Sequence, residues 1–171
     1  HDPLPILDVS SRLASNTSAF KVSESDVLGL GAAMADLGQQ SQFDAISLNK
    51  LYSVLTTAAG GGDPTKLATV LRITGDTAQD FKQQFGEDAT QTVLKFLGSL
   101  DQFKNQGGDL NTVLRSLGLG SDRTQKAIDE LTNRSATLSK SVSDTKTQFM
   151  QQTEVNKQYG NTVQTLDSQL K

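Results

Sequence analysis

Few side chains of this chain could carry out catalysis. The 171 residues include no cysteine and a single histidine, His1. A Ser-His-Asp or Cys-His arrangement would need that histidine, and we expect the first residues to be loosely held. Disulfides require cysteine, and zinc sites usually combine several cysteine or histidine ligands. The composition therefore excludes a disulfide framework and a Cys- or multi-His metal site, and it disfavours nucleophilic catalysis.

Carboxylates are the remaining candidates for acid–base chemistry. They occur in three close pairs: Glu24 with Asp26, Glu87 with Asp88, and Asp129 with Glu130. Neighbouring side chains on a helix point about 100° apart, so adjacent carboxylates do not share a site. Glu24, Asp26 and Asp88 also fall in the first turns of predicted helices, where the helix dipole favours negative charge. We interpret them as helix caps and not as a general acid and base.

The glycine clusters do not match a phosphate-binding loop. The stretch from Gly60 to Lys66, Gly-Gly-Gly-Asp-Pro-Thr-Lys, lacks the Gly-Lys-Ser/Thr order and follows a predicted helix instead of a strand. Gly118-Leu119-Gly120 lacks the third glycine of a dinucleotide fingerprint. Both are typical of helix ends. Phe81, Phe85, Phe96 and Phe103 have the spacing of a small core across two helices, so no cofactor is expected.

Charge and hydropathy exclude further classes. The chain has 16 basic and 19 acidic residues, a net charge of −3, so no basic excess favours a phosphate backbone and no specific nucleic-acid binding is expected. Aromatic residues make up 5% and tryptophan is absent, which leaves few platforms for stacking bases or sugars. The longest notable apolar run, Val27 to Ala35, is far shorter than the roughly 20 residues of a membrane span. The residues point to no enzyme.

The elements that remain are helical. Apolar residues recur at helical spacing between capping residues and glycines, and no long run alternates with period two. Ser23, Asp109 and Ser121 are predicted N-caps, and Gly75 is a predicted stop. The predicted helices cover about 4–19, 23–38, 44–59, 64–72, 77–86, 88–104, 109–117 and 121 onward.

Two of these helices allow a prediction about packing. Small residues crowd the second helix at Gly29, Gly31 and the alanines that follow, which indicates that a neighbouring helix packs closely there. In the third helix, five apolar residues are predicted to face inward: Ile46, Leu48, Leu51, Val54 and Leu55.

The region from Ile128 to the end has a different pattern. Thirteen positions from 128 to 170 alternate at spacings of three and four, and nine of them are apolar or aromatic. This heptad seam includes four polar members, Ser135, Thr145, Gln152 and Asn156. It predicts either a coiled-coil-like extension or one amphipathic helix folded back on the bundle. The seam residues predicted to make contacts with a partner are Leu138, Val142, Phe149, Tyr159, Val163, Leu166 and Leu170.

The predicted fold class is all-α. A compact multi-helix bundle of short helices with Gly-rich turns spans residues 1–120, and a long C-terminal coiled-coil-like helix spans residues 121–171 as the start of an extended rod. Self-association through that helix is expected.

Four stretches of the sequence carry information beyond composition and helical spacing. The segment from Phe81 to Leu100, FKQQFGEDATQTVLKFLGSL, resembles the core signature of phage tail tape measure proteins. The segment 25–38 is similar to an earlier helix of that family, 107–119 to its Gly-Gly-Asp turn and Leu-Gly step, and 151–166 to the onset of its long helical region. Together the resemblance spans about Leu7 to Lys171.

The resemblance implies a fragment of a structural virion protein. Members of the family lie in the lumen of the phage tail, set tail length, organise assembly of the tail tube and leave during genome ejection. Partners implied by the resemblance are the tail tube protein, tail assembly chaperones and baseplate or hub proteins, with the host cytoplasm as the place of assembly. The alternative is a helical binding or adaptor module of a secretion or chaperone-like system, which would hold an amphipathic partner helix in a groove.

Overall fold

The computed structural model describes residues 22–35 and 41–170. The helix predicted over 4–19 and the end of the helix predicted over 23–38 lie outside these residues. The described residues form α-helices and no strand, which confirms the all-α prediction. The helices are α2 (Glu24–Ala35), α3 (Ser41–Ala59), α4 (Pro64–Thr74), α5 (Ala78–Glu87), α6 (Ala89–Asn105), α7 (Leu110–Ser116), α8 (Asp122–Asn133) and α9 (Ser135–Leu170).

Local capping chemistry explains most of the helix boundaries. The Ser23 hydroxyl accepts a hydrogen bond from the Asp26 amide at 3.1 Å and so caps α2. An Asp88 carboxylate oxygen does the same for the Gln91 amide at the start of α6. Gly75 ends α4 with a φ of 76°, a left-handed conformation that glycine adopts without a steric penalty. These caps and stops confirm the predicted boundaries from α4 to α7 within one or two residues.

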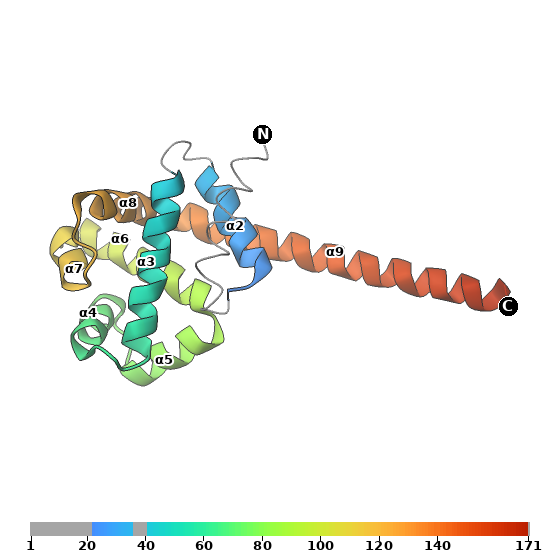
Figure 1. The fold of residues 1–171 in the computed structure, drawn as a ribbon, viewed down its shortest axis with the longest axis horizontal. Helices are drawn as coiled ribbons and strands as arrows, with labels where there is room; N and C mark the ends of the chain where they lie inside the picture. Colours follow the sequence, from blue (N-terminus) through green and yellow to red (C-terminus); the bar gives the residue numbers. More distant parts are fainter. Residues whose placement is uncertain (1–21, 36–40, 171) are drawn as a thin grey trace.

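Helices α3 to α8 gather around one core at one end of the molecule (Figure 1). α3 packs against α4, α5, α6 and α8, and α6 packs against α4, α5, α8 and α9. Phe81 and Phe96 are fully buried, and Phe85 and Phe103 are partly buried against the same core. The four phenylalanines are therefore core residues, as their spacing predicts. No helix in the described ranges is long and apolar enough to cross a membrane.

α2 packs closely against α9. The Ser141 hydroxyl donates a hydrogen bond to the Gly29 carbonyl at 2.7 Å. A Cβ added to Gly29 would lie 2.8 Å from the Val142 Cα and 3.3 Å from the Thr145 Cβ. Only glycine therefore permits this spacing. The close neighbour predicted from the small residues of α2 is α9.

The helix predicted from residue 121 onward is interrupted. α8 ends at Asn133, Arg134 has φ −106° and ψ 14°, and α9 begins at Ser135. Neither proline nor glycine stands there. On one side of the break Leu131 is buried where α8 packs on α3 and α6, and on the other Leu138 is buried where α9 packs on α2 and α6. The bend lets each helix reach its own packing surface, and the last helix begins at Ser135, not at residue 121.

The inward face predicted for α3 is wrong at Ile46. Its side chain is 42% exposed, whereas Leu48, Leu51 and Leu55 are fully buried. Ile46 lies about 200° around the helix from Leu48, because each residue turns the helix by roughly 100°. The acidic side chain of Asp44 is buried instead.

The Gly29 contact can be tested with a pair of glycine-to-alanine variants. Gly29→Ala should lower the free energy of unfolding by roughly 1–3 kcal/mol, because the new methyl group meets backbone atoms of α9. Gly98→Ala is the control, since nothing lies within 4 Å of a Cβ in the middle of α6. It should leave the stability unchanged or raise it by up to about 1 kcal/mol. Urea unfolding measures both, and equal stabilities of the two variants would contradict the contact.

Candidate interaction surface

The near half of the heptad seam lies inside the molecule. Ile128, Leu131 and Val142 are fully buried, and Leu138 is 2% exposed. These side chains belong to the same cluster as the core of α3 and α6. Leu138 and Val142, which the sequence predicts as contacts with a partner, are thus occupied by the chain's own helices. For this stretch the fold-back alternative describes the structure.

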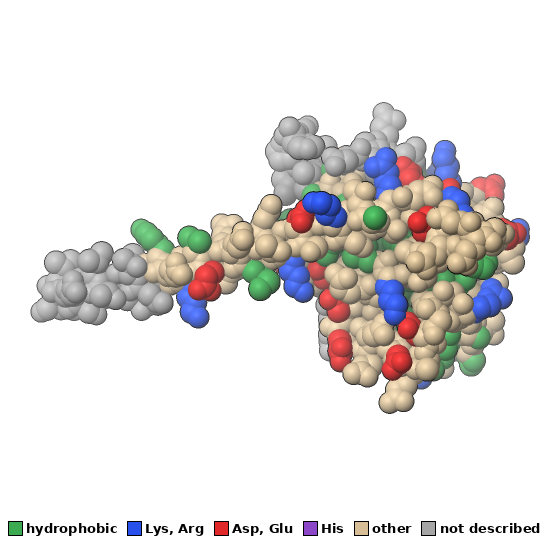
Figure 2. Space-filling view, turned by 180° about the vertical axis from the view of Figure 1, so that it is seen from behind, with side chains coloured by type: hydrophobic (Ala, Val, Ile, Leu, Met, Phe, Trp, Pro, Cys, Tyr) green, Lys and Arg blue, Asp and Glu red, His purple; other side chains and the backbone are tan. Residues whose placement is uncertain are grey.

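The far half of the seam leaves the module. Beyond residue 149, α9 continues to Leu170 as a single helix with no other described helix beside it (Figure 1). Phe149 is 41% exposed and Tyr159 is 72% exposed. Figure 2 shows hydrophobic side chains standing out from this part of the rod. Val163, Leu166 and Leu170 are on the same helix, but their side chains lie outside the described ones.

Two further apolar side chains are exposed on the rod. Met150 and Val155 are 65% and 61% exposed, although neither occupies a seam position. Val155 lies one turn before Tyr159 and widens the apolar strip, because residues four apart are neighbours on a helix. The polar seam residues Gln152 and Asn156 are exposed on the same strip. We call residues Phe149, Val155 and Tyr159 the rod strip; the heptad positions alone identify only two of the three.

A cleft of about 260 Å³ lies at the root of the rod. The N-terminal end of α2, the corner between α5 and α6, and one turn of α9 form its walls. Its charged and large apolar lining residues are Asp26, Glu87, Asp88, Lys146, Phe149 and Met150. Three carboxylates and one lysine give it an acidic balance beside an apolar edge, which suits an amphipathic partner with basic groups.

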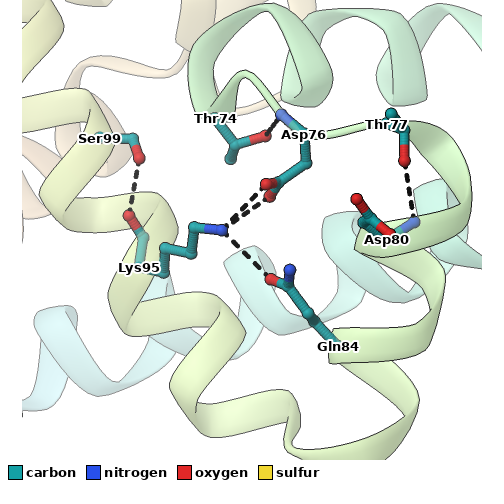
Figure 3. A network of polar contacts seen from close by, with 7 residues as sticks. All are labelled: Thr74, Asp76, Thr77, Asp80, Gln84, Lys95 and Ser99. Atoms are coloured by element: carbon teal, nitrogen blue, oxygen red, sulfur yellow. Dashed lines mark hydrogen bonds and ion pairs between the residues drawn. The ribbon is translucent and has the colours of Figure 1, made fainter.

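The polar clusters of the module hold helices together. The Lys95 ammonium group on α6 donates to both carboxylate oxygens of Asp76 at 3.0 Å and to the Gln84 side-chain oxygen at 3.2 Å (Figure 3). This network ties the α4–α5 turn and α5 to α6. The Tyr52 hydroxyl bonds to Thr90 at 2.8 Å within the core, and burial raises the pKa of Tyr52 well above its usual value.

In each of the three carboxylate pairs, the fold accounts for the aspartate. Asp88 caps α6, and Asp129 forms an ion pair with Lys104 at 2.6 Å. Asp26 is buried at the start of α2 and lines the root cleft. Within the described part of the chain, no three acidic or histidine side chains are grouped closely enough to hold a metal ion.

Comparison of the chain with protein-family models, with curated proteins and with solved structures gives no match. The resemblance to tape measure proteins therefore depends on the quoted stretches of sequence, and the rod strip and root cleft are assigned from the geometry of this chain.

The rod strip predicts self-association. Tyr159→Glu places a charge on the strip and should weaken assembly at least tenfold without lowering the melting temperature, because this side chain is 72% exposed. Lys157→Glu is the control: it changes the charge by more, but lies off the seam. Sedimentation equilibrium over a range of concentrations measures both. A wild-type chain that stays monomeric throughout, or equal weakening by both variants, would contradict the strip as an interface.

Proposed function

We propose that this chain is a structural segment of a phage tail tape measure protein, located in the tail lumen after assembly in the host cytoplasm. It sets tail length, organises assembly of the tail tube and is expelled during genome ejection. The proposed partners are the tail tube protein, the tail assembly chaperones and the baseplate or hub proteins. The sequence resemblance supports this proposal, and one structural observation carries it: a single helix extends from a compact module and exposes an apolar strip.

The physics of length measurement suits that shape. A helix rises 1.5 Å per residue, so the 36 residues of α9 extend about 54 Å. Residues 150–170 account for about 30 Å beyond the module. A ruler needs a constant rise per residue and resistance to bending. Pairing of copies along the rod strip would stiffen it, which makes self-association part of the proposal.

A second candidate is a helical binding or adaptor module of a secretion or chaperone-like system. The root cleft favours it, because Phe149 and Met150 border three carboxylates at a point where a basic amphipathic helix could lie. The two functions differ in solution. The tape measure predicts assembly through α9 that grows with concentration, whereas the adaptor predicts a monomer that binds an amphipathic partner helix. Light scattering with and without such a peptide distinguishes them.

Tail length in the parent phage is the direct test. Ten heptads with the pattern of residues 149–170, inserted after residue 160, should lengthen the tail by about 105 Å, because 70 residues rise 1.5 Å each. Replacing an existing heptad by another of equal length is the control and should leave tail length unchanged. Electron microscopy of many tails measures both. Unchanged tails after the insertion would refute a ruler role for this segment.

A further inference from the structure

One buried carboxyl group has no role in the surfaces described so far. Asp44 lies in the first turn of α3 and is 0% exposed. Neither of its carboxylate oxygens has a hydrogen-bond partner. An ionised carboxylate that is removed from water without compensating hydrogen bonds is strongly disfavoured, so the native packing selects the neutral acid.

The joint between α8 and α9 supplies its charged neighbours. α3 packs on α8, and the charged groups that act on Asp44 are Glu130 and Arg134. Glu130 is in the last turn of α8, and Arg134 is the residue at which α8 gives way to α9. Thr132, between them in sequence, is also fully buried with an unpaired hydroxyl oxygen. Two buried polar side chains without partners thus lie on α3 and α8, which pack together beside the joint.

The pKa of Asp44 is raised to about 7: burial is the largest cause, like-charge repulsion from Glu130 adds to it, and Arg134 opposes it. The position of Asp44 in the first turn of α3 would favour the charged form through the helix dipole. Here the loss of water outweighs that effect. The acid therefore changes its charge near neutral pH.

We propose that Asp44 is a proton-controlled latch at the joint between α8 and α9: the neutral acid lets α3 pack closely on the last turn of α8, and the carboxylate loosens that contact and lets the joint open. The assignment depends on the burial of Asp44 and on the helix break at Arg134. It holds whether or not the rod belongs to a phage tail.

The sign of the pH effect follows from linkage. The folded chain holds the Asp44 proton up to a higher pH than the unfolded chain, whose pKa is near 3.8. The stabilisation is fully present below about pH 4 and is lost as pH rises through about 7. The free energy of local opening at the joint falls over the same pH range, because opening exposes the carboxyl group to water.

Hydrogen exchange tests the latch in the intact chain. Amides of residues 122–145 should lose protection by roughly tenfold or more between pH 5.5 and pH 8.5, after correction for the intrinsic pH dependence of exchange. Amides of α4 and α7 should change much less, which separates opening of the joint from global unfolding. Asp44→Asn, which cannot ionise, should remove the pH dependence. Asp109→Asn, which alters an exposed cap of α7, should keep it.

A flat wild-type profile, or an Asp44→Asn variant with the wild-type pH dependence, would overturn the latch. Carbon-detected NMR of the Asp44 carboxyl group in the wild-type chain keeps the test decisive if Asp44→Asn fails to fold. The titration midpoint should lie well above the ordinary aspartate value, and Glu130→Gln should lower it. A midpoint near 4 would overturn the proposal.

Discussion

The backbone contact between α2 and α9 at Gly29 determines which part of α9 is held in the module and which part is exposed. With the Ser141 hydroxyl on the Gly29 carbonyl and no room for a Cβ, α9 lies against α2 at residues 141–145. The two helices run in opposite directions, since Gly29 meets Val142 while Asp26 lines the same cleft as Phe149. α2 thereby holds one end of α9 in the module. Contacts between the seam and a partner are therefore confined to the residues from Phe149 onward.

One heptad pattern therefore has two environments. Its near half forms part of a globular core, and its far half is exposed on a free helix. The sequence cannot distinguish these uses, because the 3-4 spacing is the same whether the partner helix comes from the same chain or from another copy. The pattern is therefore equally compatible with extension and with fold-back. Of the seven predicted seam contacts, Leu138 and Val142 are in the core, and Phe149 and Tyr159 are on the exposed rod.

Features governed by neighbouring residues were predictable, and features governed by distant ones were not. Ser23, Asp88 and Gly75 act within a turn of themselves, and the helix boundaries that they set match the structure. No proline or glycine marks the break at Arg134 in the sequence. The break depends instead on which helices α8 and α9 pack against. The outward position of Ile46 and the burial of Asp44 have the same origin: tertiary packing selects the face of α3.

The joint at Arg134 is the place where a buried polar side chain, Asp44, has its clearest effect on the structure. An apolar residue of similar volume in place of Asp44 would give a firmer contact between α3 and α8, because a buried polar group without a hydrogen-bond partner costs free energy. The acid instead makes the joint sensitive to protonation at the base of a helix about 54 Å long. The direction of the rod depends on the contacts that hold the first turns of α9, with α2 at Gly29 and with α8 at the joint, whereas its reach depends only on its number of residues.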